Sequence, residues 1–149
     1  MLEKNWHVTL LFLGEIPEES LKDWASEMTN GLTDFSPFQV EVKEIALFPT
    51  PAKAGYIVAT VEASPKLLAV KAAIDQVAGR LNVEVETRPF RPHITLARGK
   101  RQQPLSSTIL PLEAGFSFWV NRITLYESQL MKSGAVYQSR IEQRLTINC

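Results

Sequence analysis

The two histidines of this chain stand in the same local pattern. His7 begins the run His-Val-Thr-Leu, and His93 begins the run His-Ile-Thr-Leu. Imidazole titrates near neutral pH, so a neutral ring can take up a proton while a charged ring gives one up. Side chains two positions apart in a strand share a face, so Thr9 and Thr95 can present hydroxyl groups beside their histidines. The four residues predict an acid–base pair acting on an anion.

Basic residues surround the second motif, and no acidic residue stands between residues 88 and 101. A phosphate group fits this charge. When a phosphoryl group is displaced in line, the attacking and leaving oxygens lie on opposite sides of phosphorus, so a base and an acid are needed on opposite sides. Two like motifs related by a pseudo-twofold axis supply both, and their threonine hydroxyls can hold the remaining oxygens. The residues therefore predict phosphoryl transfer that needs no metal ion.

Each of these residues also has a plainer interpretation. The two histidines could be structural strand residues, and the two threonines could reflect strand propensity alone. Arg98 is either a phosphate contact or a solvated loop charge, and its strand parity is opposite to that of His93. Phe48 and Tyr126 could stack on a base, but core packing is the preferred interpretation for both. The other basic residues fit a solvated rim or loose steering of RNA better than catalysis: Arg88, Arg91, Lys100 and Arg101.

The elements that must hold the motifs follow from hydrophobic spacing and from breakers. Trp24 and Trp119 are predicted to lie in the core. The predicted elements are a buried strand at 6–13, a helix at 17–31, an antiparallel strand pair at 38–48 and 55–62 with a loop at 49–54, a helix at 65–81, a strand at 93–97, a long surface loop at 99–115, and a hairpin of strands at 116–130 and 136–147.

Length and composition limit the function further. A chain of 149 residues predicts one domain. Lys plus Arg equals Asp plus Glu at 16 each, which argues against a protein that coats nucleic acid non-specifically but allows a local phosphate site. The single cysteine, Cys149, allows no disulfide within the chain, and no signal pattern or membrane-length apolar run is present. We therefore expect a cytoplasmic protein. One cysteine and two histidines are too few for a zinc site with the usual number of ligands.

The segments HVTLLFLGE and RPFRPHITLAR, with TLYES near the end, resemble the 2H phosphoesterases. The match is greatest to the RNA 2′,3′-cyclic phosphodiesterase branch, historically called 2′-5′ RNA ligase, and runs from about residue 6 to the end. The resemblance implies a two-lobed α+β fold, with antiparallel sheets and outer helices around a central cleft. It implies opening of 2′,3′-cyclic phosphate ends, including those of tRNA fragments, to 2′-phosphates without a cofactor. Reverse 2′-5′ ligation and a monomeric state are also expected.

Carried over residue by residue, the resemblance makes His7 and His93 catalytic and makes Thr9, Thr95 and Arg98 substrate-binding. We expect His93 to be the base and His7 the acid, because the charge of Arg98 would favour the neutral form of His93. Family members usually begin with a strand and a helix before the first motif. The two His-x-Thr-Leu segments indicate an internal repeat, in which a strand and a helix should precede the first segment as they precede the second. The sequence therefore predicts a single domain that lacks this N-terminal strand and helix.

Three other functions compete with this interpretation. The same site could act on a small cyclic nucleotide, such as an ADP-ribose cyclic phosphate. A binding module for RNA ends could use the same residues without turnover. A metallohydrolase is the least favoured, and loss of activity in a chelator would revive it.

Overall fold

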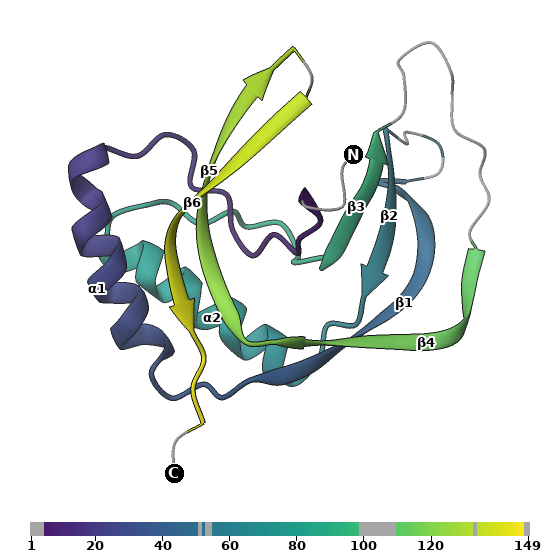
Figure 1. Ribbon diagram of the computed structural model, residues 1–149, viewed down its shortest axis with the longest axis horizontal. Coiled ribbons are helices and arrows are strands. Elements are labelled where there is room, and N and C mark those ends of the chain that lie inside the picture. The colour runs from purple at the N-terminus through teal and green to yellow at the C-terminus, as the bar shows by residue number, and fades with distance from the viewer. Residues whose placement is uncertain (1–4, 51, 53–54, 99–109, 133, 148–149) are drawn as a thin grey trace. The chain divides into compact units, whose positions relative to one another are not determined.

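Segments with apolar residues at helical spacing form helices in the computed structural model, and alternating segments form strands (Figure 1). The structure describes residues 5–50, 52, 55–98, 110–132 and 134–147. The fold class is α+β, as the sequence predicted. In chain order the elements are the short 3-10 helix η2 (Glu18–Ser20), α1 (Leu21–Leu32), β1 (Phe38–Phe48), β2 (Tyr56–Val61), α2 (Pro65–Arg80), β3 (His93–Arg98), β4 (Leu110–Val120), β5 (Arg122–Met131) and β6 (Gly134–Arg144).

The strands form two sheets. One has four strands in the order β3-β2-β1-β4, and the other is the hairpin of β5 and β6. Strand β2 pairs antiparallel with both β1 and β3, and β5 pairs antiparallel with β6. The predicted strand pair within residues 38–62 and the predicted C-terminal hairpin are both confirmed.

The chain divides into two compact units. Each unit draws on three separated stretches of the sequence. Unit 1 takes the residues up to Thr9 together with Val40–Ala63 and Phe90–Phe118. Unit 2 takes Leu10–Gln39, Ser64–Pro89 and the residues from Trp119 onward.

A bulge bends the sheet of unit 1 where β1 passes β2. Val42 pairs with Val61 and Ile45 pairs with Ala59, so two β1 residues lie opposite the single residue Thr60. The Thr60 hydroxyl accepts a hydrogen bond from the Glu44 amide at 3.2 Å and donates one to the Glu44 carbonyl at 3.3 Å. The threonine therefore satisfies backbone groups that the bulge removes from the ladder, and the bulge increases the local twist.

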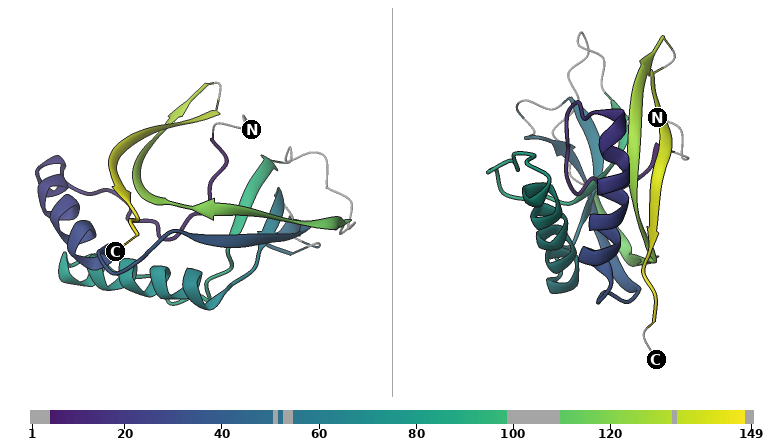
Figure 2. Two further views of the ribbon diagram at one scale, coloured as in Figure 1. Left: turned by 60° about the horizontal axis from the view of Figure 1, so that its bottom comes forward. Right: turned by 90° about the vertical axis from the view of Figure 1, so that its left-hand side faces the viewer.

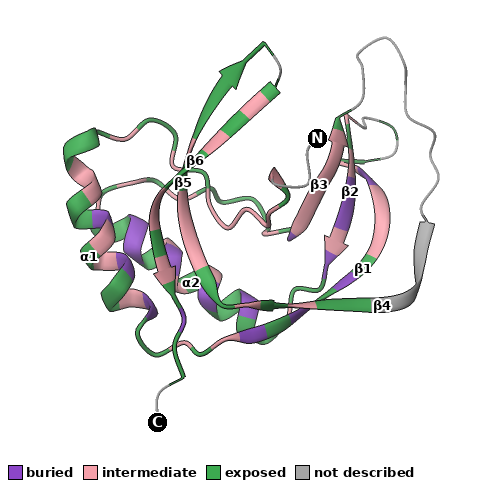
Figure 3. Ribbon diagram, in the orientation of Figure 1, coloured by how far each residue is buried: buried purple, intermediate pink, exposed green. Residues whose placement is uncertain are grey.

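Both helices of unit 2 bury the apolar face that their sequences predict, and α2 begins at the predicted residue. Helix α1 begins at Leu21, after the 3-10 helix η2, rather than at residue 17. The Ser64 hydroxyl caps α2 by accepting a hydrogen bond from the Leu67 amide at 3.3 Å, with Pro65 in the first turn. Trp24, at 3% exposure, belongs to the buried stripe of α1. The apolar stripes are Trp24, Met28 and Leu32 on α1 and Leu67, Val70, Ile74, Val77 and Ala78 on α2 (Figure 3).

Helix α1 packs against both α2 and β6 of the β5–β6 hairpin (Figure 2). Trp24 and Met28 of α1 meet Val77 and Ala78 of α2, and the hairpin adds Ile123, Leu125 and Ile141. The helices approach closely at Gly31, because a Cβ atom there would lie 2.8 Å from the Val77 Cγ2 atom. Gly31 therefore lies inside α1 for a packing reason.

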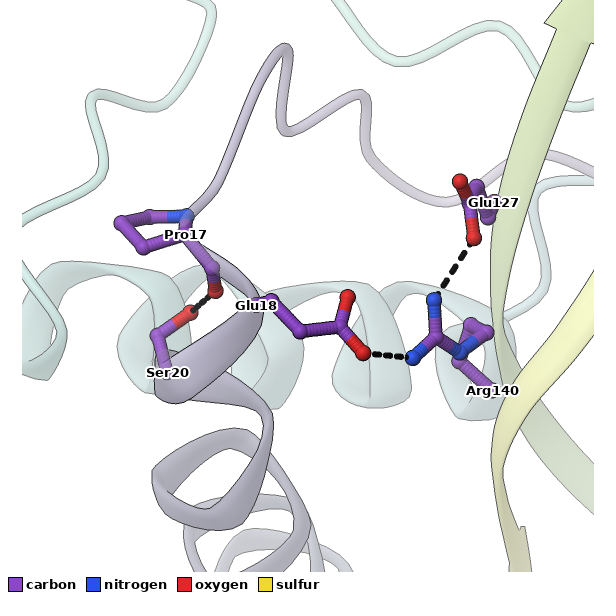
Figure 4. Close-up of polar contacts among 5 residues, drawn as sticks. All are labelled: Pro17, Glu18, Ser20, Glu127 and Arg140. Atoms are coloured by element: carbon purple, nitrogen blue, oxygen red, sulfur yellow. Dashed lines mark hydrogen bonds and ion pairs between the residues drawn. The ribbon is translucent and has the colours of Figure 1, made fainter.

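A second bulge, in β6, directs Arg140 toward two carboxylates. Leu125 pairs with Ile141 and Tyr126 pairs with Ser139, which leaves Arg140 as the extra residue. Its guanidinium donates to Glu18 at the start of η2 and, at 2.6 Å, to Glu127 of β5 (Figure 4). These hydrogen bonds raise the pKa of Arg140, and the bond that it donates to Glu18 contributes most. Figure 4 also shows the Ser20 hydroxyl donating to the Pro17 carbonyl at 2.6 Å.

The prediction of a buried strand at 6–13 is wrong. The segment has one isolated antiparallel bridge, Val8 to Ile94, and Phe12 is 79% exposed. The segment lies partly in each unit, since unit 1 ends at Thr9 and unit 2 begins at Leu10. The segment contacts only β3, the edge strand of its sheet, through one bridge, and this contact is too small to bury both faces of the segment. The apolar composition of the segment gives no sign of this.

The predicted loop at 99–115 is wrong for its last part, because β4 begins at Leu110. Residues 99–109 of that loop lie outside the described residues. Pro111 and Gly115 argued against a strand, but β4 is at the edge of its sheet, where a missing amide hydrogen is tolerated.

The single predicted strand at 116–130 is wrong, because Asn121 separates β4 from β5. The chain there changes from one sheet to the other, and alternation continues on both sides of the change. Trp119 was predicted in the core, but it is 61% exposed near the end of the edge strand β4. The last strand also ends at Arg144 rather than at residue 147.

Candidate functional site

Both histidines of the paired motifs lie in unit 1, and each ring makes the same kind of contact with the backbone. Nδ1 of His93 lies 2.7 Å from the carbonyl oxygen of Arg91, two residues earlier. Nδ1 of His7 lies 2.6 Å from the carbonyl oxygen of Asn5, also two residues earlier. A carbonyl oxygen only accepts hydrogen bonds, so the proton of each neutral ring sits on Nδ1. Nε2 of each neutral ring then carries no proton.

The antiparallel bridge between Val8 and Ile94 sets the two motifs in register. Side chains alternate along an extended chain, so His7 and Thr9 point away from the face of Val8, as His93 and Thr95 point away from that of Ile94. One step from the bridge in each direction, His7 lies opposite Thr95 and Thr9 lies opposite His93. The bridge is thus the centre of a local twofold relationship between the motifs.

Arg98 reaches the same face through a bulge in β3. Val58 pairs with Thr95, but Ile57 pairs with Ala97, so Leu96 is an extra residue. Without the bulge, Arg98 would point away from the histidine. With the bulge, Arg98 pairs with Tyr56 and Thr95 pairs with Val58. Tyr56 and Val58 lie two residues apart on one face of β2, so Arg98 and Thr95 lie on the same face of β3. The parity objection to Arg98 is therefore removed.

An aromatic ring of β2 lies beneath the Arg98 guanidinium. The Arg98 Cζ atom is 6.0 Å from the centre of the Tyr56 ring, at the outer range of a cation–π contact. Arg98 itself is exposed, whereas the four motif residues are half-buried. A guanidinium held at the edge of this face can still contact an anionic ligand from solvent.

Sequence reasoning missed the contact between Phe48 and His93. Their rings are stacked, with centres 4.3 Å apart and planes inclined by 28°. Phe48 ends β1 and His93 begins β3, with β2 between them in the sheet. The preferred interpretation of Phe48 as core is wrong, because the ring is half-buried and packs on the imidazole. No local pattern could signal a contact that depends on the bulged, twisted sheet.

The family model of the 2′-5′ RNA ligase superfamily matches residues 4–130, a span that includes both His-x-Thr motifs. The chain belongs to this superfamily. The superfamily resemblance seen in the two motifs is therefore confirmed over most of the chain.

Known proteins resemble this superfamily member in both sequence and fold. An RNA 2′,3′-cyclic phosphodiesterase of Thermus thermophilus is 32% identical over 136 residues, covering 88% of this chain and 67% of the relative. A crystal structure of a protein from Thermus thermophilus matches with a TM-score of 0.76 at 31% identity, over 94% of this chain and 78% of that one. Escherichia coli LigT complexed with 3′-AMP matches with a TM-score of 0.77 at 25% identity, over 97% and 79%.

The remaining basic residues near the second motif differ in surroundings. The Arg91 guanidinium lies over the Phe48 ring that stacks on His93, with the Arg91 Cζ atom 4.6 Å from the ring centre. Arg88 belongs to unit 2 and is paired with Glu86. Lys100 and Arg101 lie outside the described residues.

Tyr126 lies in unit 2, on the hairpin of this superfamily member. Its ring meets that of Tyr137 edge to face, with centres 6.1 Å apart. It is 45% exposed, so the core interpretation is wrong for Tyr126 as well.

Two features are absent from the residues that the structure describes. No group of three or more His, Cys, Asp or Glu side chains among them could hold a metal ion. None of the helices formed by these residues is long and apolar enough to cross a membrane.

Proposed function

We propose that this chain hydrolyses the 2′,3′-cyclic phosphate ends of RNA to 2′-phosphates, using His7 and His93 as its acid and base. The observation that carries the proposal is the Val8–Ile94 bridge, because it brings two like motifs to one face in antiparallel register. The naming of the Thermus thermophilus relative as an RNA 2′,3′-cyclic phosphodiesterase supports the substrate class.

The proposed reaction is an in-line displacement at phosphorus. Nε2 of His93 takes a proton from water while the water oxygen forms a bond to phosphorus. The bond from phosphorus to the ribose 3′ oxygen breaks. Nε2 of protonated His7 gives its proton to that oxygen. The product carries a 2′-phosphate and a free 3′-hydroxyl, and the two histidines have exchanged protonation states.

The threonines would stabilise the transition state in this scheme. The hydroxyls of Thr9 and Thr95 donate hydrogen bonds to the non-bridging phosphate oxygens, where negative charge accumulates. Because each threonine lies opposite the histidine of the other motif, the phosphorus would be held between two acid–base groups and two donors. Arg98 contacts the phosphate from the edge of the same face.

We assign the role of base to His93 and the role of acid to His7. Arg98 lies on the face of β3 that carries His93, in a strand whose bulge directs it there. The same steps with a 5′-hydroxyl of RNA in place of water would join two RNA ends through a 2′-5′ bond, because the 5′ oxygen forms a bond to phosphorus while the bond to the 3′ oxygen breaks.

The test uses the whole chain and a short RNA that ends in a 2′,3′-cyclic phosphate. Phosphorus NMR follows the end group in a buffer containing EDTA. We expect a 2′-phosphate signal to replace that of the cyclic phosphate. Binding of the RNA without any product would instead favour a non-catalytic RNA-end module, and turnover that stops in EDTA would favour a metallohydrolase.

A second candidate substrate is a small nucleotide with a cyclic phosphate. The observation in its favour is the structural relative Escherichia coli LigT, which was solved with 3′-AMP. Comparing kcat/KM for a cyclic mononucleotide with that for RNA of increasing length separates the two. A value that rises with length supports RNA ends, including tRNA fragments, and a value highest for the mononucleotide supports the small substrate.

The monomeric state and the cytoplasmic location also belong to the proposal. The lone cysteine at position 149 suits a reducing compartment. Light scattering of the purified chain tests the first, and fractionation of cells tests the second.

A further inference from the structure

Four contacts link Phe48, Arg91 and His93 into a closed cluster in unit 1. The His93 imidazole stacks on the Phe48 ring at 4.3 Å, and its Nδ1 atom donates to the Arg91 carbonyl at 2.7 Å. The Arg91 guanidinium lies over the same Phe48 ring at 4.6 Å. The guanidinium also donates, through Nη1, to the Pro49 carbonyl at 3.1 Å. The carbonyl of Pro49 therefore orients Arg91, and Arg91 in turn contacts both Phe48 and His93.

From this cluster we infer that Phe48 and Arg91 are positioning residues for His93. The inference rests on the proposed function, because it concerns the orientation of one of the two histidines. Phe48 sets the plane of the imidazole, and Arg91 keeps Phe48 in place while its carbonyl holds the Nδ1 proton. Neither side chain needs to touch the substrate.

The hydrogen bond alone leaves the ring incompletely fixed. The imidazole moves through two side-chain torsions, and a single contact at Nδ1 does not fix both, so Nε2 can still move. A flat ring stacked at 4.3 Å removes that freedom. Misplacing a reacting group by about 1 Å can cost a hundredfold in rate, so the orientation of Nε2 matters to turnover.

The surroundings of the Phe48 ring argue against its two simpler roles. A core residue would be buried, whereas Phe48 is half-buried. A ring that stacks on an RNA base needs an open face, whereas this ring already contacts an imidazole and a guanidinium. Arg91 is likewise oriented by a backbone carbonyl, unlike an arginine that only steers RNA from a distance.

The experiment compares Phe48→Leu and Phe48→Tyr, because leucine removes the flat ring and tyrosine keeps it. Proton NMR of the free protein reads the imidazole directly, and the chain has only two histidines to assign. We expect the His93 ring protons to lose their upfield ring-current shift in Phe48→Leu and to retain it in Phe48→Tyr. On the cyclic-phosphate RNA, kcat should fall about ten- to a hundredfold in Phe48→Leu with KM unchanged, and Phe48→Tyr should keep most activity.

Arg91→Lys separates positioning from charge steering. Lysine keeps the charge but cannot lie flat on the ring while bonding to the Pro49 carbonyl. Positioning predicts a lower kcat and a partial loss of the ring-current shift. Steering predicts the same kcat as wild type, together with a KM that depends on salt, and that result would overturn the role of Arg91.

The NMR measurement tests the contact between Phe48 and His93 even if the protein does not turn over the RNA. An unchanged His93 spectrum in a folded Phe48→Leu variant overturns the inference, whatever the activity. A changed spectrum with normal kcat in an active enzyme overturns it as well. An inactive wild type that shows the ring-current shift contradicts the proposed function and leaves the ring contact itself supported.

Discussion

Val8 faces Ile94 across a single antiparallel bridge, and this pairing relates the two His-x-Thr motifs by a local twofold axis. Each histidine thereby lies opposite the threonine of the other motif. The proposed reaction needs a base and an acid on opposite sides of phosphorus, and two copies of one motif in this register would supply both.

The proposed protonation states predict a bell-shaped dependence of kcat/KM on pH, because activity requires one neutral and one charged imidazole. The low-pH limb reports the base, which must lose its proton, and the high-pH limb reports the acid, which must keep it. Residual activity of His93→Ala should therefore lack the low-pH limb, and that of His7→Ala the high-pH limb. Initial rates across pH measure both, and an exchange of the two results would reverse the assignment.

Removing either threonine hydroxyl should lower kcat much more than it raises KM. Thr9→Val and Thr95→Val keep the side-chain shape, and each deletes one proposed donor to the transition state, which costs about a hundredfold or more in similar sites. Single-turnover rates on the cyclic-phosphate RNA measure the loss. Thr124→Val on β5 in unit 2 is the control and should keep the wild-type rate. Equal rates in all three variants would remove the threonines from the site.

Neutralising Arg98 should weaken substrate binding. A hydrogen bond to a charged group contributes roughly 1.5–3 kcal/mol, so Arg98→Gln should raise KM by about tenfold or more. The matched control is Arg88→Gln, since Arg88 is paired with Glu86 in unit 2. Steady-state kinetics at two salt concentrations test this. An equal, small effect of both substitutions would make Arg98 one more solvated charge.

Gly31 and Gly79 should respond to alanine in opposite directions. A Cβ atom at Gly31 would meet Val77 Cγ2 at 2.8 Å, so Gly31→Ala should lower the free energy of unfolding by roughly 1–2 kcal/mol. A Cβ atom at Gly79, in α2, would have no neighbouring atom within 4 Å, so Gly79→Ala should raise it by about 0.5–1 kcal/mol. Urea denaturation measures both, and stabilisation by both substitutions would contradict the close helix packing.

Local patterns were enough to predict the helices, the paired strands and the two motifs. The stripe containing Trp24 and Met28 has helical spacing, and the cap at Ser64 is a short-range signal. These features depend on residues within one or two turns of each other, which is the range over which side-chain periodicity carries information.

What the sequence could not predict depends on register and on tertiary contacts. The extra residue Leu96 reverses the direction of Arg98, and no residue type marks it as a bulge. The stack of Phe48 on His93 joins strands that are not neighbours in the sheet. The exposure of Trp119 follows from its position in an edge strand, whereas its apolar type suggested the core.

The most direct test of the central claim is the turnover of an RNA 2′,3′-cyclic phosphate in EDTA by wild type, His7→Ala and His93→Ala, with the product identified by phosphorus NMR. The two-histidine account predicts a 2′-phosphate from wild type. It also predicts rates lowered by about a hundredfold to ten-thousandfold in each folded variant. Wild-type rates in either folded variant, or a 3′-phosphate product, would contradict it.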